Sequence, residues 1–102
     1  SKQYKKRSET DNKYFFGANY LNRIAYAFLY DNKIEEAIEV LKLAISEDSQ
    51  NAYLYDSIGA AYFKAKDYEN AMKNYEKSLE LNPENSNAKK NLSKIIELKE
   101  KK

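Results

Sequence analysis

The sequence predicts an all-α protein, an α-α superhelix of two helix pairs followed by a C-terminal capping helix. Three observations support this prediction. Apolar residues recur three and four positions apart, the pattern repeats after 34 residues, and the 102 residues contain only two Gly and one Pro. The first spacing is that of an amphipathic helix. A sheet protein of this length would need more turn residues, so the composition favours one small helical domain.

The repeat aligns residues 18–50 with residues 52–84. Its pairs are Leu21 with Tyr55, Ile24 with Ile58, Ala25 with Gly59, Phe28 with Tyr62, Ile34 with Tyr68, Ala37 with Ala71 and Leu41 with Tyr75. A third, partial register places Leu92 opposite Ile58 and Ile96 opposite Tyr62. Such a repeat is typical of stacked helix pairs. We expect repeats at about 18–51 and 52–85, a capping helix at 86–102, and a linker or extra helix at 1–17.

Turn and capping residues predict where the helices begin and end. The predicted helices span about 18–31, 34–47, 52–65, 68–81 and 86–100. Asn32 stands three residues before Glu35, which predicts a capping box, and Asp67 is predicted to cap the fourth helix. Asn82-Pro83 ends that helix, since proline cannot continue one. Asn85 or Ser86 then caps the last helix.

Four small residues predict where the helices of a pair approach each other closely. Ala25, Ala37, Gly59 and Ala71 lie at positions where a larger side chain would hold two helices apart. Glycine in a helix interior costs roughly 1 kcal/mol relative to alanine. We therefore expect close packing against Gly59 to be the reason for its presence.

The composition excludes most enzyme chemistry. The chain has no Cys and no His, so it lacks disulfides, Cys/His zinc sites, thiol nucleophiles and His-dependent triads. Asp56-Ser57 has neither a His base nor a Gly-x-Ser-x-Gly turn. The carboxylates of Glu35, Glu36 and Glu39 are interpreted as a solvated helix face. We expect no catalytic residues, no cofactor and no metal site.

Charge and hydropathy set limits on the partner and the compartment. The net charge is +2, but residues 18–85 carry seven basic and twelve acidic residues, while residues 86–102 carry six basic and two. The final lysines are interpreted as a solubilising cap, because no aromatic residue is interleaved with them as nucleic-acid binding would favour. No stretch reaches the roughly 18 apolar residues of a membrane span. The lack of Cys fits the cytoplasm, or equally a piece of an exported periplasmic or extracellular protein.

The second unit resembles the tetratricopeptide repeat (TPR), a family of helical-pair repeats. The residues that match its signature in order and spacing are Tyr55, Ile58-Gly59, Tyr62, Ala71, Tyr75 and Pro83. The first unit departs from the signature at Leu21, Ala25, Leu41 and Ser49. The resemblance covers residues 18–102 and implies an interaction module.

The resemblance also implies that the first helix of each pair lines a concave groove that holds ligands. The predicted partner-binding residues lie off the packing stripe of these helices: Asn19, Asn22, Arg23, Tyr26, Tyr30, Tyr53, Asp56, Ser57, Ala60, Phe63, Lys90, Asn91 and Lys94. Asn can bond a peptide backbone as donor and acceptor, and Tyr and Arg supply contact area. We therefore expect a protein or peptide partner. The alternatives are an idle solvated surface, or one filled by residues 1–17.

The TPR proteins that hold chaperone tails use a clamp of Lys, Asn, Asn, Lys and Arg. The residues at the matching positions here are Asn22, Tyr26, Ser57, Asn87 and Asn91. The clamp is absent, so binding of chaperone tails is disfavoured.

A narrower likeness supports an alternative function. Residues 21–26, 33–38 and 55–62 are similar to a short TPR module at the C-terminus of some bacterial hydrolases of the beta-lactamase-like and esterase-like kind. This chain would then be a regulatory or structural appendage that packs in cis. Self-association into a homodimer is a further alternative, because two full units leave apolar edges uncovered.

Overall fold

A computed structural model describes residues 17–101 as five helices joined by short turns, without a strand in that range. The first helix covers residues 17–30, and it is followed by α2 (Ile34–Glu47), α3 (Ala52–Lys64), α4 (Tyr68–Leu81) and α5 (Ser86–Glu100). Gly17 is already helical, and the rest of the predicted N-terminal segment, residues 1–16, lies outside the described residues. The all-α fold class is confirmed.

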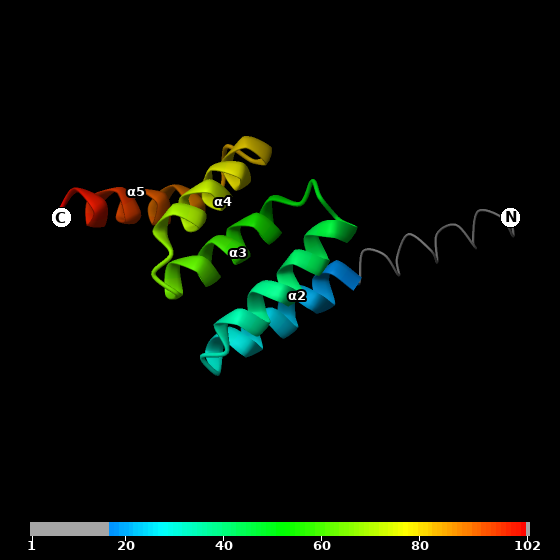
Figure 1. The fold of residues 1–102 in the computed structure, drawn as a ribbon. Helices are drawn as coiled ribbons and strands as arrows, with labels where there is room; N and C mark the ends of the chain where they lie inside the picture. The colour runs from blue at the N-terminus through cyan, green and yellow to red at the C-terminus, as the bar shows by residue number, and fades with distance from the viewer. Residues whose placement is uncertain (1–16, 102) are drawn as a thin grey trace, which may run out of the picture.

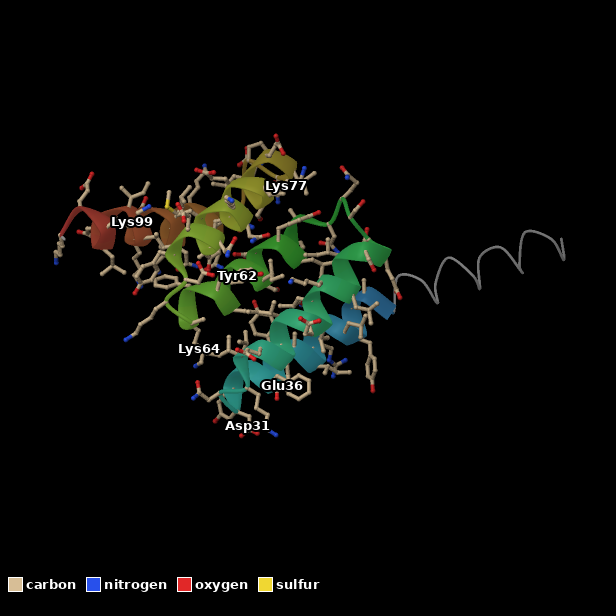
Figure 2. All side chains as sticks on the ribbon, in the orientation of Figure 1. Asp31, Glu36, Tyr62, Lys64, Lys77 and Lys99 are labelled. Carbon is tan, nitrogen blue, oxygen red and sulfur yellow. The ribbon has the colours of Figure 1, made fainter. Side chains whose placement is uncertain are left out.

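The helices form a stack with α3 at its centre. Figure 1 shows the first helix beside α2, then α3 and α4, and α5 at the opposite end of the stack. One core cluster joins Ala25 of the first helix, Leu41 of α2 and Ile58 of α3. A second joins Tyr75 of α4 to Ile95 of α5. Tyr62 of α3 packs against both clusters (Figure 2), so α3 is covered from two sides.

Tyr75 of α4 packs directly on Gly59 of α3. A Cβ atom at Gly59 would lie 3.0 Å from Cδ1 and Cε1 of Tyr75 and 3.1 Å from its Cζ. Both residues are buried, as are Ala25, Ala37 and Ala71. The predicted close approach is therefore confirmed at Gly59, and the three alanines are buried in the core.

Two of the turns end their helices in Schellman motifs. After the first helix, the Lys33 amide donates to the Phe28 carbonyl at 2.7 Å and the Asn32 amide donates to the Leu29 carbonyl at 3.0 Å. After α3, the amides of Asp67 and Lys66 donate to the carbonyls of residues 62 and 63 in the same way. These bonds satisfy carbonyls that the helix ends leave free.

The predicted capping box at Asn32 is wrong. Asn32 has a φ of 63° and serves as the left-handed residue that closes the first helix. Lys33 takes the N-cap position of α2, and no side chain caps that end. Asn tolerates the left-handed region better than most non-glycine residues. Asn32 therefore closes the first helix and does not cap α2.

The other predicted caps are confirmed. The Asp67 side chain accepts from the Asn70 amide, and the Asn85 side chain accepts from the Ala88 amide. Asn85 also donates through Nδ2 to Ser78 Oγ at 2.9 Å, and Ser78 donates to the Ala52 carbonyl at 2.9 Å. This chain of bonds ties the start of α5 to α4 and to the start of α3.

Gly59→Val is expected to lower the free energy of unfolding by about 2 kcal/mol, because the added carbons would overlap the buried Tyr75 ring. Urea unfolding followed by circular dichroism measures the change. The control is Ala60→Val, which places a valine at the next, half-buried position of α3. Equal unfolding midpoints for the two variants would contradict the packing role of Gly59.

Lys66→Gly is expected to raise the free energy of unfolding by roughly 0.5–1 kcal/mol, because glycine adopts positive φ without strain. Lys66 has a φ of 65° and an exposed side chain, so no packing is lost. The same change at exposed Lys73, inside α4, should instead lower it by about 1 kcal/mol. Thermal unfolding of both variants checks the opposite signs, and a fall for both would refute the assignment.

Candidate functional site

The first helix, α3 and α5 share one side of the stack, which we call the inner face. Two hydrogen-bonded residue pairs connect these helices, and the residues of each pair are 31 positions apart. Ser57 Oγ of α3 donates to Tyr26 Oη of the first helix at 3.2 Å. Asn87 Nδ2 of α5 donates to the Asp56 carboxylate, at 3.0 Å to Oδ2 and 3.2 Å to Oδ1. The equal spacing shows that successive first helices of the repeats meet in the same way.

The structure separates the predicted partner-binding residues into three groups. The exposed ones are Asn19, Arg23, Tyr26, Tyr30, Tyr53, Lys90 and Lys94. The half-buried ones are Asn22, Phe63 and Asn91, together with Ala60. Asp56 and Ser57 are buried, with 8% and 3% of their surface exposed. The exposed tyrosines and cations thus offer contact area, while Asp56 and Ser57 expose little surface.

Two expectations for individual residues are corrected. Asp56 and Ser57 were expected off the packing stripe, yet they are buried because the neighbouring helices bond to them from either side. Phe63 packs inward against the second core cluster and meets Tyr68 edge to face, with ring centroids 5.7 Å apart. Phe63 is therefore mainly a core residue.

Sequence reasoning missed the part played by Asn87 and by the hydroxyl of Tyr75. The sequence pattern identifies Asn87 only as a position of the absent clamp and Tyr75 only as a core aromatic residue. Asn87 follows Asp56 by 31 positions in the sequence, the same separation as between Tyr26 and Ser57. This shared separation is the sequence feature that could have indicated the contact. No signal in the sequence reveals that the Tyr75 hydroxyl is buried without a partner among the described residues.

Two buried polar atoms at this site have no hydrogen-bond partner among the described residues. They are Tyr75 Oη and Asn22 Oδ1. Burial raises the pKa of the Tyr75 hydroxyl, and the Asp56 carboxylate and Tyr26 raise it further. The charges of both residues therefore act on the Tyr75 hydroxyl. Unpaired buried polar atoms are uncommon and call for an explanation.

Two hollows of the described surface lie along α2, away from the predicted partner-binding residues. The larger one has a volume of about 710 Å³ and is lined by Asn32, Lys33, Ile34, Glu35, Glu36, Ile38, Tyr62, Ala65 and Asp67. None of the predicted partner-binding residues lines it. Two of its carboxylates, Glu35 and Glu36, are on the exposed side of α2 as predicted, and the third, Asp67, caps α4. Over residues 17–101, no group of three or more acidic side chains could hold a metal ion.

Comparison with protein families identifies the repeat units. Family models described as tetratricopeptide repeat match residues 18–51 and residues 53–85. Together these two ranges include the four helices before α5, except for the first residue of the first helix and of α3. The chain belongs to the tetratricopeptide repeat family.

Solved structures give the same fold. The second TPR of Spaghetti (RPAP3) bound to the HSP90 peptide SRMEEVD has a TM-score of 0.79 at 27% identity, covering 83% of this chain and 79% of that one. The first TPR of Spaghetti (RPAP3) bound to the same peptide has a TM-score of 0.77 at 27% identity, covering 95% and 85%. The first TPR domain of the human RPAP3 protein, solved by NMR, gives 0.77 at 27% identity, covering 94% and 84%.

A search of curated protein sequences gave no match. Within the described residues, none of the helices has the length and apolar character needed to cross a membrane. The TPR assignment therefore stands on the family models, on the solved structures and on the stacked geometry of the chain.

Tyr75→Phe is expected to raise the free energy of unfolding at neutral pH by about 1 kcal/mol, because it removes a buried hydroxyl that has no partner. The folded state holds the Tyr75 proton above the ordinary pKa of 10.0, so the unfolded state loses it first as pH rises. The stability that the protonated Tyr75 hydroxyl contributes is complete below pH 10, the ordinary pKa of tyrosine, and is lost as the pH rises further.

Urea unfolding over roughly pH 9 to 11 tests this pH dependence. The Tyr75→Phe variant should lose less stability across that range than the wild type. A steeper loss in the variant would be inconsistent with a buried, unpaired hydroxyl.

Proposed function

We propose that the chain binds a protein or an extended peptide on its inner face, through side chains of the first helix, α3 and α5. TPR repeats and similar structures that hold a peptide support a non-catalytic interaction scaffold. The observation that supports the proposal is the set of side chains on the inner face. It combines exposed tyrosines, exposed cations and a buried polar pair on rigidly stacked helices.

Pre-organisation is the physical basis of such binding. The inner-face helices are fixed by the core and by the bonds Ser57–Tyr26 and Asn87–Asp56. Side chains that are already held in place lose little conformational entropy when a partner binds. Tyr53 and Tyr26 are 65% and 45% exposed and offer aromatic contact area. Tyrosines of this kind often dominate the energy of an interface.

The partner is expected to differ from the peptide held by the similar structures. That peptide, SRMEEVD, carries three carboxylate side chains near its end. This chain has neutral residues at the clamp positions and a buried carboxylate, Asp56, between two of them, Tyr26 and Asn87. A carboxylate-rich tail would be repelled there instead of being neutralised.

The hydrolase appendage and the homodimer stay as predictions of the sequence. The appendage predicts a catalytic domain encoded upstream of Ser1, and the free scaffold predicts a start codon or more repeats. Light scattering over a concentration series separates monomer from dimer.

Selection of random displayed peptides against the folded chain tests the proposal. Tyr53→Ala should raise the Kd of a selected peptide by about fivefold or more, since it removes an exposed aromatic anchor of the inner face. The matched control is Leu43→Ala, an apolar residue of α2 that is 52% exposed. If Leu43→Ala weakens binding and Tyr53→Ala does not, the peptide lies on another surface and the proposal is wrong.

A further inference from the structure

Asp56 is a buried carboxylate whose only hydrogen-bond partner among the described residues is a neutral amide. It is 8% exposed and accepts from Asn87 Nδ2 through both oxygens. The two ion pairs of residues 17–101 join Lys33 to Asp31 and Lys77 to Glu80, so neither involves Asp56. A buried charge is costly unless a cation or several donors compensate it. Asp56 therefore has unused capacity to accept hydrogen bonds.

Near Asp56, the hydroxyl of Tyr75 is a second polar group with unused hydrogen-bonding capacity. The Tyr75 ring crosses Gly59, one helical turn after Asp56, with the hydroxyl-bearing Cζ 3.1 Å from the Cβ position. The residue is fully buried and its Oη has no partner. Its ring lies on Gly59 of α3, in the core cluster that α4 forms with α5, and burial, together with the nearby Asp56 carboxylate, raises the pKa of its hydroxyl. A buried oxygen close to Asp56 is thus left without a partner among the described residues.

The surrounding groups accept hydrogen bonds more than they donate them. Ser57 already donates to Tyr26, and Asn87 already donates to Asp56. One turn before Tyr26, Asn22 presents a buried Oδ1 without a donor. The free acceptors are the Asp56 carboxylate and the Asn22 amide oxygen, while the phenol groups of Tyr26 and Tyr75 can donate as well as accept. The complement of such a site is a cation with several N–H donors and no acceptor.

Of the two cationic side chains, arginine matches these features more fully than lysine. A guanidinium offers five donors in a planar fork and can bond a carboxylate while it reaches a second oxygen. It also stacks on aromatic faces, and Tyr26 and Tyr53 expose rings on this face. Repeat residues 18–85 carry seven basic and twelve acidic residues, so their net charge of −5 also favours a basic partner.

We propose that the Asp56 site, formed by Asp56 with Tyr26 and Asn87 on the inner face, binds the guanidinium of an arginine side chain in the bound peptide. This inference rests on the proposed function and names what the partner carries at the centre of the inner face. The lysines of α5 that share the face, Lys90 and Lys94, are exposed and take no part in the ion pairs of the described residues. They remain available for acidic or polar residues that flank the arginine.

The test uses pools of short peptides with blocked ends, uncharged random flanks and one fixed central residue. The central residue is arginine, citrulline or glutamate; citrulline keeps the shape of arginine and removes its charge. Titrations followed by NMR report on the Asn87 side-chain amide and on the backbone of α3. The arginine pool should shift these resonances with an apparent Kd about tenfold or more below that of the citrulline pool, as expected for charge-assisted bonds.

Asp56→Asn is the matched variant. The new amide oxygen can still accept from Asn87 Nδ2, so the fold should persist, and an unchanged or higher unfolding midpoint verifies this. In the variant, the preference for arginine over citrulline should vanish. Preference that survives in the variant would overturn the proposal, because the carboxylate would then not be the group that binds.

The remaining outcomes separate this inference from the proposed function. If the arginine and citrulline pools bind the inner face equally well, the arginine site is wrong and the peptide-binding function stands. The same conclusion follows if the glutamate pool binds more tightly than the arginine pool. If none of the pools shifts any inner-face resonance, the site and the proposed function are both wrong.

Discussion

The contact between Tyr75 and Gly59 is the constraint on which the rest of the structure depends. It lets α4 lie close against α3, and it leaves the Tyr75 hydroxyl buried without a hydrogen-bond partner among the described residues. A side chain at residue 59 would push the two helices apart. The positions of Asp56 and Ser57, which lie on the turns of α3 beside Gly59, would then change as well. One glycine therefore connects the packing of the repeat to the geometry of its candidate site.

The central position of α3 explains why the polar groups of the site are buried. α3 lies between the first helix with α2 on one side and α4 with α5 on the other, and seven of its thirteen residues are buried. Its polar residues must therefore find partners on neighbouring helices. Ser57 does so through Tyr26 and Asp56 does so through Asn87. The unsatisfied capacity that remains is what a bound partner would use.

Much of this fold could be predicted from the sequence, because its information is periodic. The 34-residue repeat, the small residues at Ala25 and Gly59 and the caps at Asp67 and Asn85 all act locally or at fixed spacing. The Asn32 cap failed because two local motifs compete for one residue. The site was harder to predict, since burial of Asp56 depends on Asn87 of a later helix, and the unpaired Tyr75 hydroxyl depends on the depth of helix packing.

Native-state hydrogen exchange tests most directly whether α3 and its contact with Tyr75 organise the domain. The amides of α3 around Gly59 should exchange only through global unfolding, while those near the free end of α5 should exchange through local opening at lower free energy. Addition of denaturant distinguishes the two processes. Amides of α3 that exchange by local opening, while α5 stays protected to the global limit, would contradict the account.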